Sequence, residues 1–297
     1  WGVWSHFTFK LQRPLMREYD VFLLPYRPSW KEQREEEKEV EPYLIFTIYD
    51  EDDNVVRKIT QKPQKGVHRI SWDFRYENPY PVDLKNEEFN PLKEDGNGIL
   101  AMPGTYKVSM SKYHHGEITE LVPPQKFETR QLEIRTLPAE DREELLEFQR
   151  KVTDLTRKIQ GADELTANMM KRMKHIKQAI LNTTAETKKL MEEAERIEDE
   201  LDEVIFAFHG VEPKASSEEI PPHEMKILER LRSLVYAHYR STSGVTETER
   251  RNYNILKEKF PPLLEKLKKL REEDIKKLEE KLNELNSPWT PGRIPEL

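Results

Sequence analysis

The sequence contains no cysteine, and this absence narrows the chemistry open to the chain. Without cysteine there are no disulfides, no thiol nucleophile and no zinc site built from thiolates, although the cellular compartment stays open. No apolar run approaches the roughly 20 residues that a membrane-spanning helix needs. The sequence therefore predicts neither a thiol enzyme nor a membrane span.

Apolar residues are also scarce, at 36% of the chain, whereas charged residues reach 35%. That pairing is typical of long, thin elements with much surface per residue, such as helical bundles and coiled coils. The apolar residues recur periodically, which argues against disorder. The net charge is −7, with both signs interspersed and no basic stripe, so we expect no nucleic acid among the partners.

The first residues show neither an initiator methionine nor a signal peptide, because the chain begins Trp1-Gly2-Val3-Trp4. We therefore expect a processed or ordered piece of a longer protein, in which residues 1–27 are an N-terminal strand segment continuing from a missing upstream domain. Within this segment, Ser5–Leu11 alternates with the period of a half-buried strand. Residues 28–41 are a charged insertion, predicted to form a short solvated helix or loop.

Residues 42–136 carry strand signals punctuated by turns. Tyr43–Tyr49 reads as a strand, Asp50–Asn54 supplies turn residues, and Val55–Ile59 returns as the partner strand. The next segment, Val67–Tyr76, alternates so that its histidine, isoleucine and aromatic side chains would face a core.

The later part of this region continues the same pattern. A long loop rich in proline, asparagine and glycine is expected over residues 77–103, before a strand at Thr105–Met110. A hairpin near His114–Gly116 leads to a last strand around Phe127–Ile134. Several short antiparallel strands over about 100 residues predict an Ig-like antiparallel β-sandwich.

The hydrophobic period changes from two to about 3.6 at Leu137-Pro138, where a helical domain covering residues 137–287 begins. One apolar stripe runs to Ile180, and a second runs over Leu190–Phe208 and ends at Gly210. The fold class is therefore α+β and multidomain. We expect four antiparallel helices, two of them longer than about 40 residues, as a bundle or long helical hairpin.

The third and fourth helices have clear start signals. Pro221-Pro222 opens the third, and Thr246 with Glu249 makes a capping box for the fourth. Pro261-Pro262 lies inside the fourth helix and should kink or interrupt it, at a cost of about 3 kcal/mol or more. Residues 288–297 form an extended tail.

No catalytic, cofactor-binding or metal-binding residue is predicted. HExxH, G-x-S-x-G, the P-loop and G-x-G-x-x-G are all absent. Asp50, Asp52 and Asn54 echo the opening of a calcium loop, but Val55 stands where glycine is needed and Gln61 where glutamate is needed. A hairpin turn explains these residues, and calcium stays the alternative.

Trp72, Phe74, Tyr76 and Tyr80 form an aromatic run that could stack on sugars. A core role on one strand is the competing interpretation for the first three residues. Trp72, Tyr76 and Tyr80 are therefore candidate contacts for a sugar or a protein partner. Exposed, coplanar rings would favour sugar binding, and burial of Trp72 and Phe74 would favour the structural role.

Several strings resemble the C-terminal region of large bacterial secreted proteins that carry sortilin-like β-propellers with BNR (Asp-box) repeats and are often labelled glycosyl hydrolases. They are YDEDDNVVRKI at 49–59, KGVHRISWDFRY at 65–76 and MPGTYKV at 102–108 in the strand region. In the helices and tail, they are LPAEDREELLEFQRKV at 137–152, VYAHYRSTSGVTETERRNY at 235–253 and PWTPGRIPEL at 288–297. The Ig-like unit is similar to that of flagellar hook-capping proteins.

This resemblance implies a propeller upstream of the chain, export to a secreted, periplasmic or cell-surface location, and a non-catalytic C-terminal region for docking or assembly. The implied partners are the propeller and, through the helices, another protein or a second copy. Two rival interpretations stay open: part of a glycoside hydrolase or peptidase, or a carbohydrate-binding module. No Asp-box lies within this sequence, so no catalytic residue is carried over.

Overall fold

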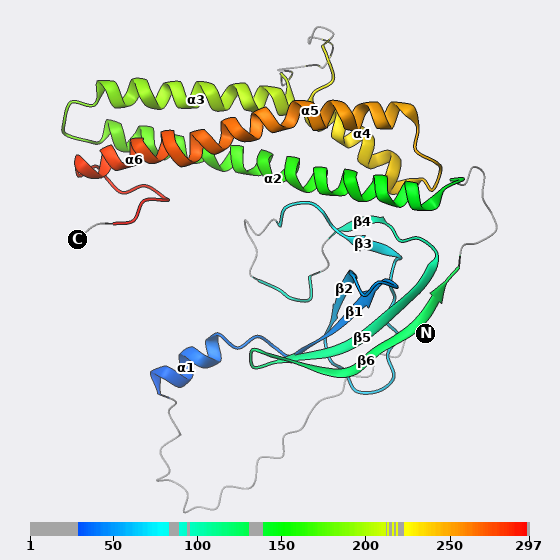
Figure 1. The fold of residues 1–297 in the computed structure, drawn as a ribbon. Coiled ribbons are helices and arrows are strands. Elements are labelled where there is room, and N and C mark those ends of the chain that lie inside the picture. Colours follow the sequence, from blue (N-terminus) through cyan, green and yellow to red (C-terminus); the bar gives the residue numbers. More distant parts are fainter. Residues whose placement is uncertain are drawn as a thin grey trace, which may run out of the picture.

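The computed structural model has a mixed α+β architecture, which confirms the expected fold class at that level (Figure 1). The strands and the long helices occupy separate parts of the molecule, with the helices of the C-terminal half lying together. The strand segment predicted at residues 1–27 lies outside the residues described. The structure describes residues 29–82, 89–93, 96–130, 139–211, 213, 216, 218 and 223–295.

Four antiparallel strands form the main sheet, in the order β2-β1-β5-β6. One hairpin consists of β1 (Tyr43–Tyr49) and β2 (Val55–Gln61), and the other of β5 (Gly104–His114) and β6 (Glu117–Thr129). Pairing of β1 with β5 joins the two hairpins. The strands predicted at the positions of β1 and β2 are confirmed.

The two hairpin turns use residues with positive φ. Asp53 has φ 63° in the β1–β2 turn, and His115 and Gly116 have φ 49° and 82° between β5 and β6. Aspartate and glycine tolerate this left-handed region better than most residues, so the local sequence favours both turns. Both predicted turns are confirmed.

A second, small sheet pairs β3 (Arg75–Glu77) with β4 (Asn97–Leu100). We call this pair the β3–β4 ribbon. The core beside it centres on Ile48, Val56 and Tyr106, which are at most 5% exposed. The partly buried apolar residues packed against this core are Ile59, Trp72, Tyr76, Ala101, Val108 and Phe127.

The strand predicted over Val67–Tyr76 is mostly wrong, because only its last two residues are in a strand. Phe74 has φ 58°, which breaks an extended ladder, and the side chain of Asp73 accepts a hydrogen bond from the Arg75 N–H. The segment therefore turns before β3 begins. Phe74, predicted to face the core, is 51% exposed.

The other predicted strand boundaries also shift. The last strand starts at Glu117 rather than near Phe127, because its hairpin pairing with β5 begins directly after the turn. The predicted continuation to Ile134 lies outside the described residues. The expected loop over residues 77–103 contains β4, a four-residue strand too short for a periodic pattern.

A short helix, α1, occupies the charged insertion, and the remaining helices follow the strands. Residues 139–295 contain the long helices, arranged side by side (Figure 1). The helical elements are α1 (Trp30–Glu37), α2 (Arg142–Leu181), α3 (Lys188–His209), α4 (Ile227–Arg240), α5 (Glu247–Lys269), the π-helical turn η2 (Leu270–Asp274) and α6 (Ile275–Glu284).

Two helices start later than predicted, since α2 begins at Arg142 instead of near Pro138, and α4 begins at Ile227 instead of at Pro221-Pro222. The side chain of Asp141 accepts a hydrogen bond from the Glu144 N–H at the start of α2, and Thr246 with Glu249 forms the predicted capping box of α5. Gly210, with φ 79°, ends α3 as predicted. The longest described helix, α2, has 40 residues and α5 has 23, so the prediction of two helices longer than about 40 residues is wrong.

Pro261-Pro262 is predicted to kink or interrupt α5. The interruption is wrong, since α5 continues through both prolines, and the kink stays a prediction. Phe260 is 3% exposed and its ring centroid lies 6.5 Å from that of Phe208, so burial beside the prolines favours an unbroken helix. The regular pattern changes later, at η2, where the Ile275 N–H donates to the Leu270 carbonyl five residues back.

One apolar core runs through α2 to α6. No helix among the described residues is long and apolar enough to cross a membrane. Interhelical ion pairs flank the core and join Lys177 to Glu198 and Arg172 to Glu279. The fully buried residues include Ile159, Met173, Ile176, Ala194, Ile197, Leu201, Val204, Phe208, Leu267, Leu270, Ile275, Leu278 and Leu282.

Phe208→Ala should lower the free energy of unfolding by about 3–5 kcal/mol, because it leaves a cavity in this core. Phe206 is a matched control on the same helix, since its side chain is 49% exposed. Phe206→Ala should cost less than about 1 kcal/mol. Urea unfolding followed by circular dichroism measures both values, and equal losses would contradict the assigned burial.

Candidate functional site

The helices meet the strands through the β3–β4 ribbon, and we call this contact region the junction. β4 contacts both α2 and α4, whereas β3 contacts β2 of the main sheet (Figure 1). Gly98 permits the ribbon to close tightly, because a Cβ atom there would lie 2.3 Å from the Glu77 carbonyl oxygen. The ribbon thus lies between the main sheet on one side and helices α2 and α4 on the other.

Arg75 on β3 connects the ribbon to the end of α4. Its Nη1 donates to the Gly98 carbonyl at 3.0 Å and to the Tyr239 carbonyl at 3.2 Å. The guanidinium also lies 4.0 Å from the centroid of the Tyr239 ring, in a cation–π contact. A cation near the C-terminal end of a helix interacts favourably with the helix dipole.

Two further arginines complete the junction. Arg57 on β2 donates to the carbonyls of Tyr76 and Gly96, at 3.0 and 3.2 Å. Arg150 on α2 lies 3.4 Å from the Tyr76 hydroxyl and 3.6 Å from the Asp50 carboxylate. The hydrogen bond with Tyr76 raises the pKa of Arg150 above its ordinary value, so its charge is retained.

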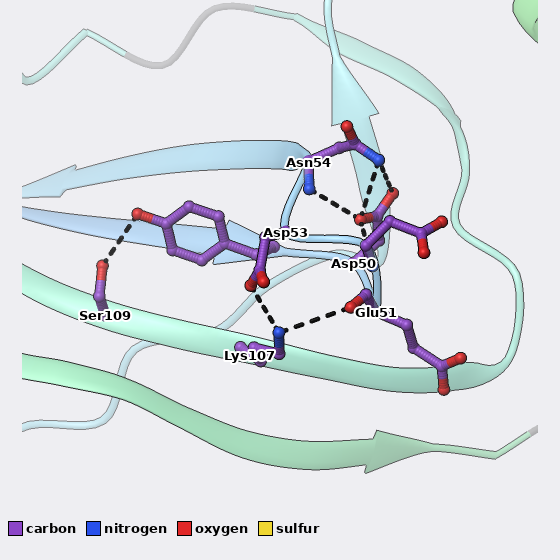
Figure 2. Close-up of polar contacts among 8 residues, drawn as sticks. Asp50, Glu51, Asp53, Asn54, Lys107 and Ser109 are labelled. Atoms are coloured by element: carbon purple, nitrogen blue, oxygen red, sulfur yellow. Dashed lines mark hydrogen bonds and ion pairs between the residues drawn. The ribbon is translucent and has the colours of Figure 1, made fainter.

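The β1–β2 turn that meets Arg150 is held by its own side chains (Figure 2). The Asp50 carboxylate accepts hydrogen bonds from the Asn54 backbone N–H at 2.9 Å and from the Asn54 side-chain amide. Lys107 on β5 bonds to the Asp53 carboxylate and to the Glu51 carbonyl. These acids therefore serve turn formation, and in the described part of the chain no three His, Asp or Glu side chains form a group that could hold a metal ion.

The helical side of the junction contains buried polar groups. His238 is 4% exposed, and its Nε2 has no hydrogen-bond partner among the described residues, with the Glu249 Oε1 at 3.9 Å. Its ring packs against Phe148 at a centroid distance of 5.2 Å. Burial lowers the pKa of His238 below its ordinary value of 6.5, and Glu249 opposes this shift. Gln149 is 2% exposed and its Oε1 also lacks a partner among these residues.

The three predicted contact residues, Trp72, Tyr76 and Tyr80, have different surroundings in the structure. Trp72 packs beside Tyr106 and Phe127, at centroid distances of 5.2 and 6.2 Å, and donates its indole N–H to the Arg75 carbonyl. Tyr76 contacts the sheet core and Arg150. Tyr80 follows β3 in the sequence and is 42% exposed.

The arginines of the junction were missed by sequence reasoning. Arg57 and Arg75 stand in predicted strand segments, where a charged residue indicates a solvent-facing position. Their bonds go to backbone carbonyls, which carry no signal in the sequence. Arg57, Arg75 and Arg150 are far apart in the sequence, so their positions alone do not predict that they meet at one junction.

The comparisons with known proteins found no protein-family model, no curated protein and no solved structure that this chain matches.

Arg75→Ala should destabilise the protein by about 2–3 kcal/mol, because it removes two charge-assisted hydrogen bonds and a cation–π contact. Amide hydrogen exchange should accelerate in β4 and at the end of α4. Arg75→Lys should recover part of the loss, since lysine keeps the charge but not the planar fork.

Arg34→Ala is the matched control, because Arg34 is exposed on α1. It should change stability by less than about 0.5 kcal/mol. Unchanged exchange at the end of α4 in Arg75→Ala would contradict the role given to Arg75.

His238 should make stability depend on pH. Its pKa is lowered in the folded state, so below pH 6.5 the unfolded chain takes up a proton that the folded chain resists. Stability is therefore full above that pH and declines as the pH falls toward the lower folded-state pKa. The nearby charged groups on α5 are Glu249 and Arg250.

Urea midpoints measured from pH 7.5 downward should show this decline in the wild type. His238→Phe should flatten the curve below pH 6.5, whereas the exposed control His68→Gln should leave it unchanged. An identical slope in His238→Phe and wild type would assign the acid sensitivity to another group.

Proposed function

We propose that this chain is a non-catalytic accessory region that mediates docking or assembly of a larger protein. In this proposal the strands form an Ig-like β-sandwich and the helices an antiparallel bundle. The observation that carries it is the Arg75 contact, which ties the ribbon to the end of α4 with directional bonds. Such a junction suits a rigid arm, because it fixes the orientation of the helices on the sheet.

The bundle interpretation is supported by how the helices contact one another. α2 contacts α3, and α4 contacts α5, as expected for neighbours joined by short connections. Ion pairs Lys266–Glu203 and Lys281–Glu193 link α5 and α6 to α3. Exposed ion pairs contribute little to stability, but together they favour one arrangement of neighbouring helices.

The sandwich interpretation is supported by the ribbon, which packs against the core beside the main sheet. A two-stranded layer opposite a four-stranded sheet is smaller than an Ig domain usually has. The proposal therefore treats the ribbon and the segment before it as a reduced second layer.

The larger protein in this proposal is the exported β-propeller protein of the sequence resemblance, and the chain would act in a secreted, periplasmic or cell-surface location. The helices would present their outer surface to the propeller, to another protein or to a second copy. Exposed apolar side chains on this half, such as Leu181 and Phe206, are suited to such contacts.

The rival hydrolase proposal needs two carboxylates facing one hollow. Glu77 and Asp154 do line a hollow of about 240 Å³ beside Arg150. However, Asp154 pairs with Lys158 at 2.6 Å and its side chain is 54% exposed. The exposed Asp154 carboxylate is thus occupied by an ion pair with a neighbour on the same helix and lacks the buried setting of a catalytic acid. The accessory proposal is therefore favoured.

The rigid-arm proposal predicts a narrow distance distribution between the sheet and the helices. Because the chain has no cysteine, spin labels can be placed at Glu120→Cys on β6 and Lys171→Cys on α2, both exposed positions. Pulsed electron paramagnetic resonance should give one sharp distance. Adding Arg75→Ala should broaden it, and a pair of labels within α2, at Lys171 and Lys151, controls for label motion.

A broad distribution in the doubly labelled chain without Arg75→Ala would overturn the proposal, because the helices would then move independently of the sheet. A sharp distance that Arg75→Ala leaves unchanged would retain the rigid arm and reject Arg75 as its cause.

A further inference from the structure

A hollow of about 240 Å³ opens where α2, α4 and the ribbon meet. We call it the tyrosine pocket. Its apolar part is lined by Val152 on α2, Val235 on α4 and Ile99 on β4. Tyr80 and Tyr236 also line it, and with side chains 42% and 65% exposed they stand at its open side.

The helix hydroxyls that line this pocket are already occupied. Thr153 donates to the Gln149 carbonyl at 2.8 Å, and Thr156 donates to the Val152 carbonyl at 2.7 Å. The inner surface is therefore mostly apolar, with the buried Nε2 of His238 lacking a partner among the described residues. A sugar, which needs a partner for each hydroxyl it buries, is poorly matched to such a surface. An aromatic ring is well matched, because tyrosine rings and aliphatic side chains both pack against its faces.

The pocket also carries one permanent charge. The charge is that of Arg232. Among the described residues that line the pocket there is no lysine, aspartate or glutamate. Arg232 is exposed, so its guanidinium is accessible at the pocket. Its charge reaches Tyr80, where it counteracts the rise in the pKa of Tyr80 that burial causes. A guanidinium in this position can bind a carboxylate through two parallel hydrogen bonds.

The size of the pocket limits the ligand. An apolar cavity of about 150 Å³ holds a benzene molecule, and typical drug-sized ligands need more than about 300 Å³. A hollow of about 240 Å³ therefore accommodates one six-membered ring with a short substituent.

We propose that the tyrosine pocket binds a small aromatic carboxylate, with its ring between Tyr80, Tyr236 and Val152 and its carboxylate on Arg232. This site goes beyond the proposed accessory function and does not depend on it. Since the pocket is lined by both helices and ribbon, a bound ligand would also tighten the junction.

Phenylacetate is the probe, and phenylacetamide, which has the same shape without the charge, is its matched control. Ligand-observed NMR titration of the full chain should give a Kd on the order of 1 mM for phenylacetate, as expected for a ligand of this size. The amide should bind at least about tenfold more weakly, because it loses the charge-assisted bonds to Arg232.

Arg232→Gln should remove the difference between acid and amide, whereas Arg251→Gln, at an exposed arginine on α5, should preserve it. Tyr236→Ala should weaken both probes by about threefold to tenfold, since it removes one stacking face. Both substitutions alter exposed side chains, and unfolding midpoints equal to wild type would verify that the variants are folded.

Equal binding of phenylacetate and phenylacetamide to the wild type would overturn the proposal, as would undiminished phenylacetate binding in Arg232→Gln. Absence of binding by either probe at about ten times the expected Kd would also reject it. Tighter binding of methyl glucoside than of phenylacetate would reassign the pocket to sugars and reject the aromatic carboxylate. None of these results bears on the spin-label distance that tests the rigid arm.

Discussion

The guanidinium of Arg75 donates at once to a strand carbonyl, Gly98, and to a helix carbonyl, Tyr239. The Gly98 carbonyl lies on the ribbon, and the Tyr239 carbonyl lies in the last turn of α4, where terminal carbonyls lack intrahelical donors. A single planar side chain satisfies both, and it also covers the Tyr239 ring. The position of the helices over the ribbon depends on this bond set, and so do the hollows that line the junction.

The helical half and the junction are stabilised by different kinds of interaction. The helical half has a continuous apolar core, so it is stabilised chiefly by burial, which is strong but not directional. The junction has hydrogen bonds from arginines, together with buried polar atoms of Gln149 and His238 that lack partners among the described residues. Directional bonds specify orientation well and tolerate few substitutions. The junction therefore depends on a few specific side chains for its orientation, whereas the helical half is stabilised by its continuous apolar core.

Much of the fold could be predicted from hydrophobic periodicity. The β1–β2 hairpin, the β5–β6 turn and the caps of α3 and α5 follow from local chemistry, and the structure has them. The ribbon could not be predicted, because its strands are three and four residues long and Phe74 precedes it with a positive φ. The two prolines at Pro261-Pro262 wrongly predicted an interruption of α5, because tertiary burial there outweighs the low helix propensity of proline. The arginine contacts were missed because their acceptors are backbone carbonyls, whereas Tyr80 was identified from its aromatic side chain alone.

The π-helical turn η2 has a consequence for how this helix tolerates insertions and deletions. A π turn contains one residue more than an α turn, and each residue advances an α-helix by about 100°. The five residues from Leu270 to Asp274 therefore rotate the chain about as far as four α-helical residues would. Removing one of them would restore a uniform α-helix and keep Ile275, Leu278 and Leu282, now fully buried, on the core face. The helix should therefore tolerate the loss of one residue in this turn, whereas a one-residue deletion within Ile275–Glu284 would rotate the following side chains away from the core by about 100°.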